Sequence, residues 1–412
     1  MRPLKSSSFS PDFRWLWCAT TVSSLGDWMF STALIFRVIT QSGSILALST
    51  LLSVEVGPML FGSVLGILVD RWDRKRLAIA TDGLRALVVL IIWVVNIKQE
   101  MWIIDAVMGT ESLLTVLAHP TRASILSSLL HNDERPRGNS LVQSGLNLAR
   151  MLGPAFGAWL LIKVGLHPVV ILDSLTYLVS LWCLTRMRIP DRAGPSRLES
   201  RPLRPLWLDW TEGFKAVIES SQLLRVRLSL ILILTADGIL SPGLVTFISR
   251  GLHENAAWYG AMQSIGAVAA IVAGLVLARF AKRLAPNLLL PLALGGHGIL
   301  YIVIFGWIRS PWAVLLLYGL GAASGALWIS SLSTVLQANI PKAIQGRVFG
   351  SLGSIQALAL LLGINLAPSL VKALGLATAL AGTGVLTMIA AMILLTARSS
   401  GKATDVVISG TP

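Results

Sequence analysis

Three carboxylic acids stand deep inside long apolar runs of the sequence. Asp27 and Asp237 lie near the middle of two such runs, and Glu111 lies within a third. Each ionisable residue at membrane depth costs about 2.5–3.5 kcal/mol to insert, so such residues usually carry a function. A carboxyl group in these surroundings can bind and release protons. We therefore expect proton exchange at all three, with Asp27 as the main carrier.

Arginines accompany these acids in the first half of the chain. Arg85 and Arg122 fall near the ends of apolar runs together with Asp82, and a structural ion-pair network is the favoured interpretation for these three. Asp27 has no Lys or Arg one turn away in its own run, so a cationic partner must come from another segment. Arg150 lies deep in its run, and we expect it to approach Asp27 and promote release of the proton.

Two tryptophans could contact a substrate. Trp28 and Trp328 fall deep within apolar runs, where their rings could stack on a planar or cationic molecule. The sequence has 14 tryptophans, and location at the membrane–water interface explains most of the others. For His297, a hydrogen bond between helices is favoured over a proton relay.

The composition identifies the medium around these residues. Of the 412 residues, 54% are hydrophobic and 13% are charged, whereas a soluble protein has about 25% charged residues. Abundant apolar residues with so little charge also exclude disorder. The net charge of +14 lies in short clusters between the apolar runs. We therefore expect a lipid bilayer around the chain, and no nucleic acid as a partner.

The motifs of common enzyme classes are absent from the sequence. It contains no G-x-x-x-x-G-K-[ST], H-E-x-x-H or G-x-S-x-G segment. The two cysteines, Cys18 and Cys183, both lie in apolar runs and form no metal-binding motif. We expect no enzyme activity, no cofactor and no metal. Any work done on a substrate must then draw on a gradient.

The apolar runs predict an all-α membrane protein with twelve transmembrane helices, because about 20 apolar residues cross a bilayer. Most of the 34 lysines and arginines fall in loops on the side of the N-terminus, which predicts that both termini are cytoplasmic. The runs cover about 13–40, 45–69, 77–97, 101–130, 139–162, 168–187, 223–249, 257–278, 286–308, 312–337, 344–371 and 376–397.

A polar interval rich in Pro and Arg divides the twelve runs into two sets of six. The predicted domains are a first six-helix bundle (1–188), a cytoplasmic linker (189–222), a second six-helix bundle (223–398) and a polar cytoplasmic tail (399–412).

An internal repeat relates the two predicted bundles. Leu152-Gly153 recurs as Leu362-Gly363, and Asp27-Trp28 has a counterpart in Asp237-Gly238, in both cases 210 positions later. A basic loop repeats 208 positions later. Recurrence of glycines and arginines at nearly constant spacing predicts two pseudo-symmetric bundles. The loop residues that recur are Gly66, Arg71, Arg74 and Lys75, matched by Gly274, Arg279, Lys282 and Arg283.

The loop segment GILVDRWDRKR (Gly66–Arg76) resembles the G-x-x-x-D-R-x-x-R-[KR] signature of the major facilitator superfamily. The resemblance implies that superfamily's fold, in which helices one, four, seven and ten line a central cavity. It also implies a cytoplasmic latch, with Asp70 capping a helix of the opposite bundle near Ala343–Arg347. The residues of this predicted cytoplasmic gate are Gly66, Asp70, Arg71, Arg74 and Arg122.

A second motif, RMLGPAFG (Arg150–Gly157), resembles the G-P-x-x-G signature of the antiporter branches. Gly153, Pro154 and Gly157 carry it, while Ala158 stands where a second Gly is usual. This motif has two interpretations: a kink with a role in coupling, or simple close packing of helices. The longer stretch from His119 to Pro154 is similar to macrolide-efflux drug:proton antiporters, a group that includes siderophore exporters.

These resemblances imply export of a small amphipathic or apolar compound, such as a drug or antibiotic, by proton antiport with alternating access. Export of a siderophore or a lipid-like metabolite by the same fold is the first alternative. A membrane receptor that does not transport, or a membrane-embedded enzyme, is the second. We expect a monomeric multi-pass protein of the inner cell membrane, with a small molecule and protons as its ligands.

Overall fold

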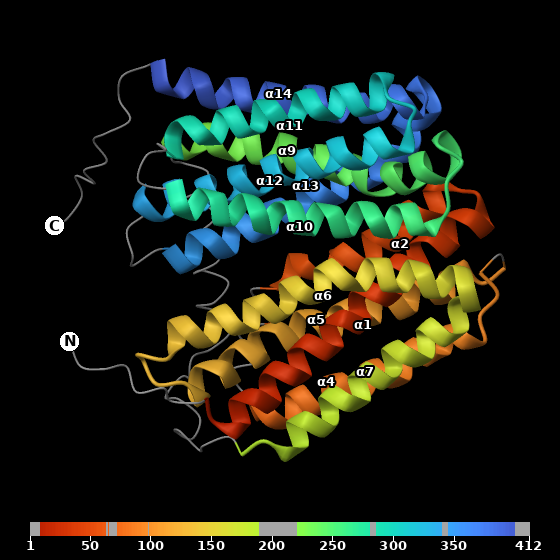
Figure 1. The fold of residues 1–412 in the computed structure, drawn as a ribbon, viewed down its shortest axis with the longest axis vertical. Helices are drawn as coiled ribbons and strands as arrows, with labels where there is room; N and C mark the ends of the chain where they lie inside the picture. Colours follow the sequence, from red (N-terminus) through yellow and green to blue (C-terminus); the bar gives the residue numbers. More distant parts are fainter. Residues whose placement is uncertain are drawn as a thin grey trace. The chain divides into compact units, whose positions relative to one another are not determined.

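A computed structural model of the protein describes residues 9–62, 65, 72–97, 99–188, 221–280, 286–339 and 345–399. Within these ranges all regular structure is helical, as the sequence predicts (Figure 1). The elements are α1 (Pro11–Ser42), α2 (Ile45–Val56), η1 (Gly57–Phe61), α4 (Arg74–Leu90), η2 (Ile91–Trp93), α5 (Met101–Leu129), α6 (Arg135–Val164), α7 (Leu166–Arg186), α9 (Ser221–Thr246), η4 (Phe247–Gly251), α10 (Ala256–Phe280), α11 (Pro286–Trp307), α12 (Pro311–Asn339), α13 (Gln345–Leu374) and α14 (Leu376–Ser399).

Each predicted apolar run coincides with one α-helix, so the described residues contain twelve α-helices at the predicted places. Ten helices in these ranges are long and apolar enough to cross a membrane. α2 and α4 are shorter. Their starts follow local capping rules, because the side chain of Ser44 accepts from Ala47 N at 3.2 Å and that of Asp73 accepts from Arg76 N at 2.7 Å.

The helices belong to two compact units. The first contains Met1–Arg37 and Phe61–Arg201, and the second contains Val38–Leu60 and Pro202–Pro412. α4 to α7 and most of α1 therefore form the first unit, and α9 to α14 form the second (Figure 1). α2 groups with the second unit, where it packs against α13 and α9. The predicted linker and tail lie almost wholly outside the described residues, so the predicted domain boundaries stay a prediction.

The same helix contact occurs once in each unit, and it confirms the internal repeat. In the first unit, a Cβ on Gly153 of α6 would meet Trp28 Cβ at 2.6 Å and Leu25 O at 3.2 Å. In the second unit, a Cβ on Gly363 of α13 would meet the backbone of Thr235 and Gly238 of α9. Thr235 and Gly238 stand 210 positions after Leu25 and Trp28. The two pairs of helices therefore pack in the same way.

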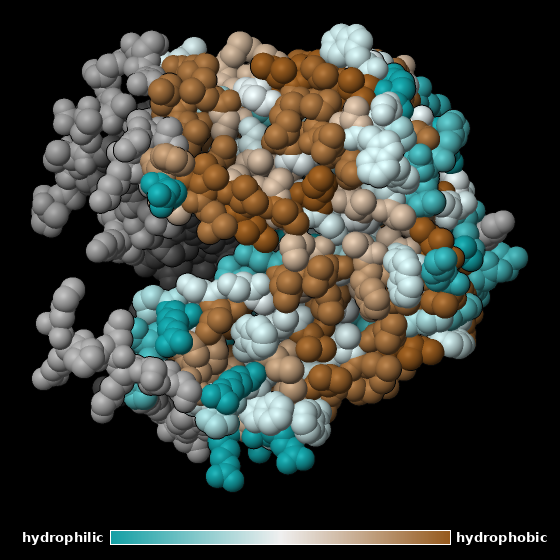
Figure 2. Space-filling model, viewed as in Figure 1, coloured by the Kyte–Doolittle hydropathy of each residue, from teal (hydrophilic) through white to brown (hydrophobic). Residues whose placement is uncertain are grey.

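The outside of both units is apolar. Figure 2 shows hydrophobic residues over much of the visible face. Large hydrophobic side chains are well exposed on α4, α10 and α12, among them Leu87, Leu275 and Trp312. Water would disfavour such a surface, whereas lipid solvates it, and helices satisfy their own backbone groups in lipid. The protein is a multi-pass integral membrane protein.

Candidate functional site

Four helices of the first unit bring ionisable side chains together. Asp27 comes from α1, Arg85 from α4, Glu111 from α5 and Tyr177 from α7. Hydrogen bonds and ion pairs join these four side chains into one polar cluster. We call it the central cluster.

Arg85 holds the two acids of the central cluster. Its Nε donates to Glu111 Oε1 at 2.7 Å, and its Nη2 donates to Asp27 Oδ1 at 3.1 Å. The guanidinium also lies 4.3 Å from the centre of the Tyr177 ring. The Arg85 side chain is 3% exposed, that of Glu111 is 12% exposed and that of Asp27 is 31% exposed. Asp27 is thus the acid most accessible to a ligand or to water.

Tyr177 bridges the two acids of the central cluster. Its hydroxyl contacts both Asp27 Oδ1 and Glu111 Oε1, yet a hydroxyl has a single hydrogen to donate. With both acids ionised, one of these two contacts therefore lacks a hydrogen. A proton on either acid supplies it. The same proton balances the charge, because Arg85 neutralises only one of the two carboxylates.

A second buried group, from α4, α5, α7 and α1, is already balanced. Arg122 Nη2 donates to both carboxylate oxygens of Asp82, at 2.9 and 2.8 Å. Ser180 Oγ also donates to Asp82, and Arg122 Nη1 donates to Ser23 Oγ. One cation and one anion, joined by two hydrogen bonds, make a structural ion pair, although the buried Arg122 Nε has no hydrogen-bond partner among the described residues. The predicted network of Asp82, Arg85 and Arg122 is corrected in one respect: Asp82 pairs with Arg122, while Arg85 pairs with Asp27 and Glu111.

A cavity of about 160 Å³ in the first unit reaches the central cluster. Asp27 and Arg85 lie in its wall, with His119 and Arg122 as further polar groups. The remaining lining is apolar or carries hydroxyl groups: Leu16, Thr20, Ser24, Thr115, Ala118, Ala123, Leu126, Val142 and Leu146.

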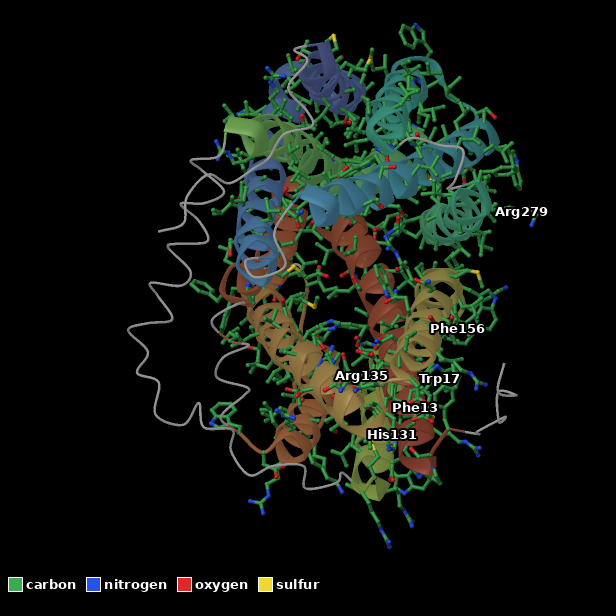
Figure 3. The ribbon with its side chains drawn as sticks, turned by 90° about the vertical axis from the view of Figure 1, so that its left-hand side faces the viewer. Phe13, Trp17, His131, Arg135, Phe156 and Arg279 are labelled. Atoms are coloured by element: carbon green, nitrogen blue, oxygen red, sulfur yellow. The ribbon has the colours of Figure 1, made fainter. Side chains whose placement is uncertain are left out.

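One end of this cavity lies near the beginnings of α1 and α6. Figure 3 labels Phe13 and Trp17 on α1 and Arg135 at the start of α6, and Trp17 Nε1 donates to Leu141 O of α6 at 2.9 Å. Leu16 and Val142 line the cavity beside these residues. The cavity therefore extends from this end of the unit to the acids near its centre.

The comparisons with known proteins agree with this architecture. The family model of the Major Facilitator Superfamily matches residues 16–364. The chain belongs to the Major Facilitator Superfamily. It is therefore a membrane transporter of small molecules and not an enzyme, as the sequence predicts.

Relatives and solved structures give the range of similarity within the superfamily. YfiS, an uncharacterised MFS-type transporter of Bacillus subtilis, is 26% identical over 397 residues, covering 92% of this chain and 91% of YfiS. Macrolide efflux protein A of Streptococcus pyogenes is 24% identical over 189 residues, covering 45% of this chain and 47% of that protein. A crystal structure of a POT family transporter in complex with 5-aminolevulinic acid has a TM-score of 0.73 at 15% identity, covering 93% of this chain and 95% of that chain.

Of the predicted proton-coupling residues, the structure brings Asp27 and Glu111 together. Arg150 is not the partner of Asp27. Its guanidinium lies 5.4 Å from the centre of the Trp28 ring, and Arg85 is the arginine bound to Asp27. Arg85 reaches Asp27 from a different helix, α4, and spacing along the sequence does not reveal such a contact.

Asp237 and Trp328 belong to the second unit. In the part of the chain that the structure describes, Asp237 takes part in no ion pair. Trp328 is 6% exposed and packs in the hydrophobic core of this unit with Leu294, Leu332 and Ile355. Its indole ring is therefore surrounded by apolar side chains, and its contact with a substrate stays a prediction.

The predicted cytoplasmic gate is described only in part. Gly66, Asp70 and Arg71 lie outside the described residues. Arg74 is the first residue of α4, and Arg122 forms the buried ion pair with Asp82. A gating role for these residues stays a prediction.

Gly153, Pro154 and Gly157 place α6 against α1. A Cβ on Gly157 would overlap the carbonyl group of Met29, and one on Gly153 would crowd Trp28. α6 continues through Pro154 without a break in the helix. The predicted close packing is confirmed, while a role of this motif in coupling stays a prediction.

Tyr177 and His119 are site residues that the sequence did not single out. Tyr177 stands in an apolar run like any core tyrosine. A weak signal exists, because Asp173, Tyr177 and Ser180 follow one another at helical spacing along one face of α7. His119 lies three residues before Arg122, so both fall on the same side of α5.

Proposed function

We propose that this chain exports a small amphipathic or apolar compound in exchange for protons, by alternating access. The observation that carries the proposal is the central cluster at the cavity wall. It holds two carboxyl groups against one guanidinium, and its single hydroxyl hydrogen faces two acid oxygens. One bound proton supplies the missing hydrogen and makes the cluster neutral. Release of this proton leaves an excess negative charge beside the cavity.

The cavity supports an amphipathic or apolar substrate. Aliphatic side chains from α1, α5 and α6 form much of its wall, and polar groups occur mainly around Asp27, Arg85 and His119. Sites for small molecules commonly combine an apolar wall with a few polar groups. A substrate with an apolar body and a polar or cationic end would fit this division.

Export is the direction favoured by the relatives. One of them is named for macrolide efflux, and the motif RMLGPAFG resembles the antiporter signature. We place the protein in the inner cell membrane as a monomer, with both termini in the cytoplasm. The cavity, which begins near the N-terminal end of α1, would then collect its substrate from the cytoplasmic side.

The test uses purified protein in liposomes with an imposed pH gradient and a panel of antibiotics, dyes and lipid-like compounds. We expect accumulation of at least one compound that collapses when the gradient is dissipated. In Asp27→Asn, which keeps shape but cannot titrate, pH-driven accumulation should be lost while downhill exchange remains. Asp133→Asn, in the exposed loop between α5 and α6, is the control and should behave like the wild type.

Two results would contradict the proposal. Full pH-driven accumulation by Asp27→Asn would exclude Asp27 as the proton carrier, and Glu111 and then Asp237 would be tested in its place. Absence of any gradient-driven flux for the whole panel, and for siderophores tested in addition to it, would contradict proton antiport itself.

A further inference from the structure

Asp173 on α7 is a buried acid that the mechanism above does not use. It is 0% exposed. It lies one helical turn before Tyr177, about 6 Å along the helix axis. Ser174 beside it is tied to α4 through a hydrogen bond to Ala86 O at 2.8 Å. The position of Asp173 in the packed interior is therefore well defined.

Thr176 places a hydroxyl group beside the Asp173 carboxyl, but this hydroxyl donates its single hydrogen to the backbone oxygen of Asp173 at 2.7 Å. Among the described residues, neither of the carboxyl oxygens has a hydrogen-bond partner, and no ion pair involves this carboxyl. A Cβ on Gly26 would lie 2.5 Å from Asp173 Oδ1, so the carboxyl points at the backbone of α1 directly before Asp27. A carboxylate in such a place has neither a hydrogen-bond donor nor a directly bound cation to stabilise its charge.

The charged groups around Asp173 come from three helices. Asp27 of α1, Glu111 of α5 and Arg85 of α4 all act on it, with Tyr177 on its own helix. α6 also packs against α7, and its Arg150 lies over the Trp28 ring. Three carboxyl groups therefore share one guanidinium. Neutrality requires two protons, one on the Asp27–Glu111 pair and one on Asp173.

We propose that Asp173 is a second proton-binding residue of the transport cycle, so that this unit carries two protons for each substrate exchanged. The inference rests on the proposed proton antiport. With two protons bound, the group of Asp27, Glu111, Asp173 and Arg85 is neutral, which suits the burial of Asp173 and Arg85. Release of both protons changes its charge by two, and this step needs a state in which water reaches Asp173 at its contact with Gly26.

The number of protons can be read from the steady state in liposomes. With the membrane potential clamped at zero, the logarithm of the substrate ratio rises linearly with the pH difference, and the slope equals the number of protons exchanged. We expect a slope of about two for the wild type and about one for Asp173→Asn. Asp133→Asn should keep the wild-type slope.

The outcomes separate this inference from the proposed function. A slope near zero in the wild type would overturn proton antiport, and with it the role of Asp173. A slope that stays the same in Asp173→Asn and in the wild type would leave antiport intact but make Asp173 a purely structural acid. Asp173→Ala is the second variant, should the asparagine variant fold poorly.

Infrared difference spectroscopy tests the same residue without transport. Spectra of the purified protein at high and low pH record carboxyl groups that gain a proton. We expect one such band to disappear in Asp173→Asn while the band of Asp27 and Glu111 remains. An unchanged difference spectrum would show that Asp173 does not titrate, and it would overturn the inference even if transport were lost.

Discussion

Two buried arginines of the first unit face different numbers of acids, and this separates their roles. Arg122 faces one carboxylate, Asp82, which also accepts from Ser180. Arg85 faces two carboxylates, and no arrangement of its own hydrogens makes that group neutral. A pair of one cation and one carboxylate is already neutral and gains nothing from a proton. A cation between two carboxylates has an excess negative charge, which a proton neutralises. Only the second suits a transport cycle.

This difference predicts how the two acids respond to the same substitution. Asp82→Asn would leave Arg122 charged and buried without its counter-ion, and breaking a buried pair in this way costs about 3–5 kcal/mol. Asp27→Asn should cost much less, because Arg85 keeps Glu111. Thermal unfolding of the two purified variants in the same detergent measures the difference. Equal destabilisation would contradict the division into a structural and a functional pair.

Sequence reasoning found the acids of the site but not their partners. Asp27 and Glu111 stand out because a carboxyl in an apolar run is costly wherever it lies. The arginine that binds Asp27 depends on the depth and rotation of α4 against α1, which a helical period within one segment does not fix. The structure pairs Asp27 with Arg85, and an approach of Arg150 to Asp27 during transport stays a prediction. For Tyr177 the sequence offers only the weak signal of its helical spacing from Asp173 and Ser180.

At the scale of elements, the close contact of α6 with α1 positions Asp27. Gly153 and Gly157 allow the α6 backbone to approach the turn of α1 that carries Trp28 and Met29. Small residues permit such approach between membrane helices. This part of the fold was predictable, because glycines four residues apart mark one face of a helix. The partner helix was not predictable in the same way.

Gly157→Ala should lower stability and disturb transport, because a methyl group there would overlap the backbone of α1. Overpacking of this kind costs about 1–3 kcal/mol. Gly274→Ala is the matched control, since Gly274 is also helical and a Cβ there would have no neighbour within 4 Å. It should be neutral or slightly stabilising. Thermal unfolding and liposome flux of the two variants test this, and equal behaviour would contradict the close packing of α6 on α1.

At the scale of the whole molecule, the two units repeat one backbone design with different chemistry. The contact at Gly153 recurs at Gly363, yet the two buried ion-pair groups seen among the described residues, around Arg85 and around Arg122, both lie in the first unit. The counterpart of Asp27 in the repeat, Asp237, has no ion-pair partner among those residues. This division supports the interpretation that the first unit handles protons.

The orientation of the chain in the membrane decides on which side of the bilayer the cavity of the first unit begins. In a variant without Cys18 and Cys183, single cysteines replace Arg309 and Asn132, two exposed residues in short connections between helices. If both termini are cytoplasmic, Arg309→Cys should react with a membrane-impermeant maleimide in intact cells. Asn132→Cys should react only after permeabilisation, when both sites should react equally.

Asn132 follows α5, which ends beside the cavity residues Leu126 and Leu16, so its side of the membrane is also the side of the cavity. Labelling of Asn132→Cys in intact cells would put that end of the cavity outside and would contradict the predicted cytoplasmic termini.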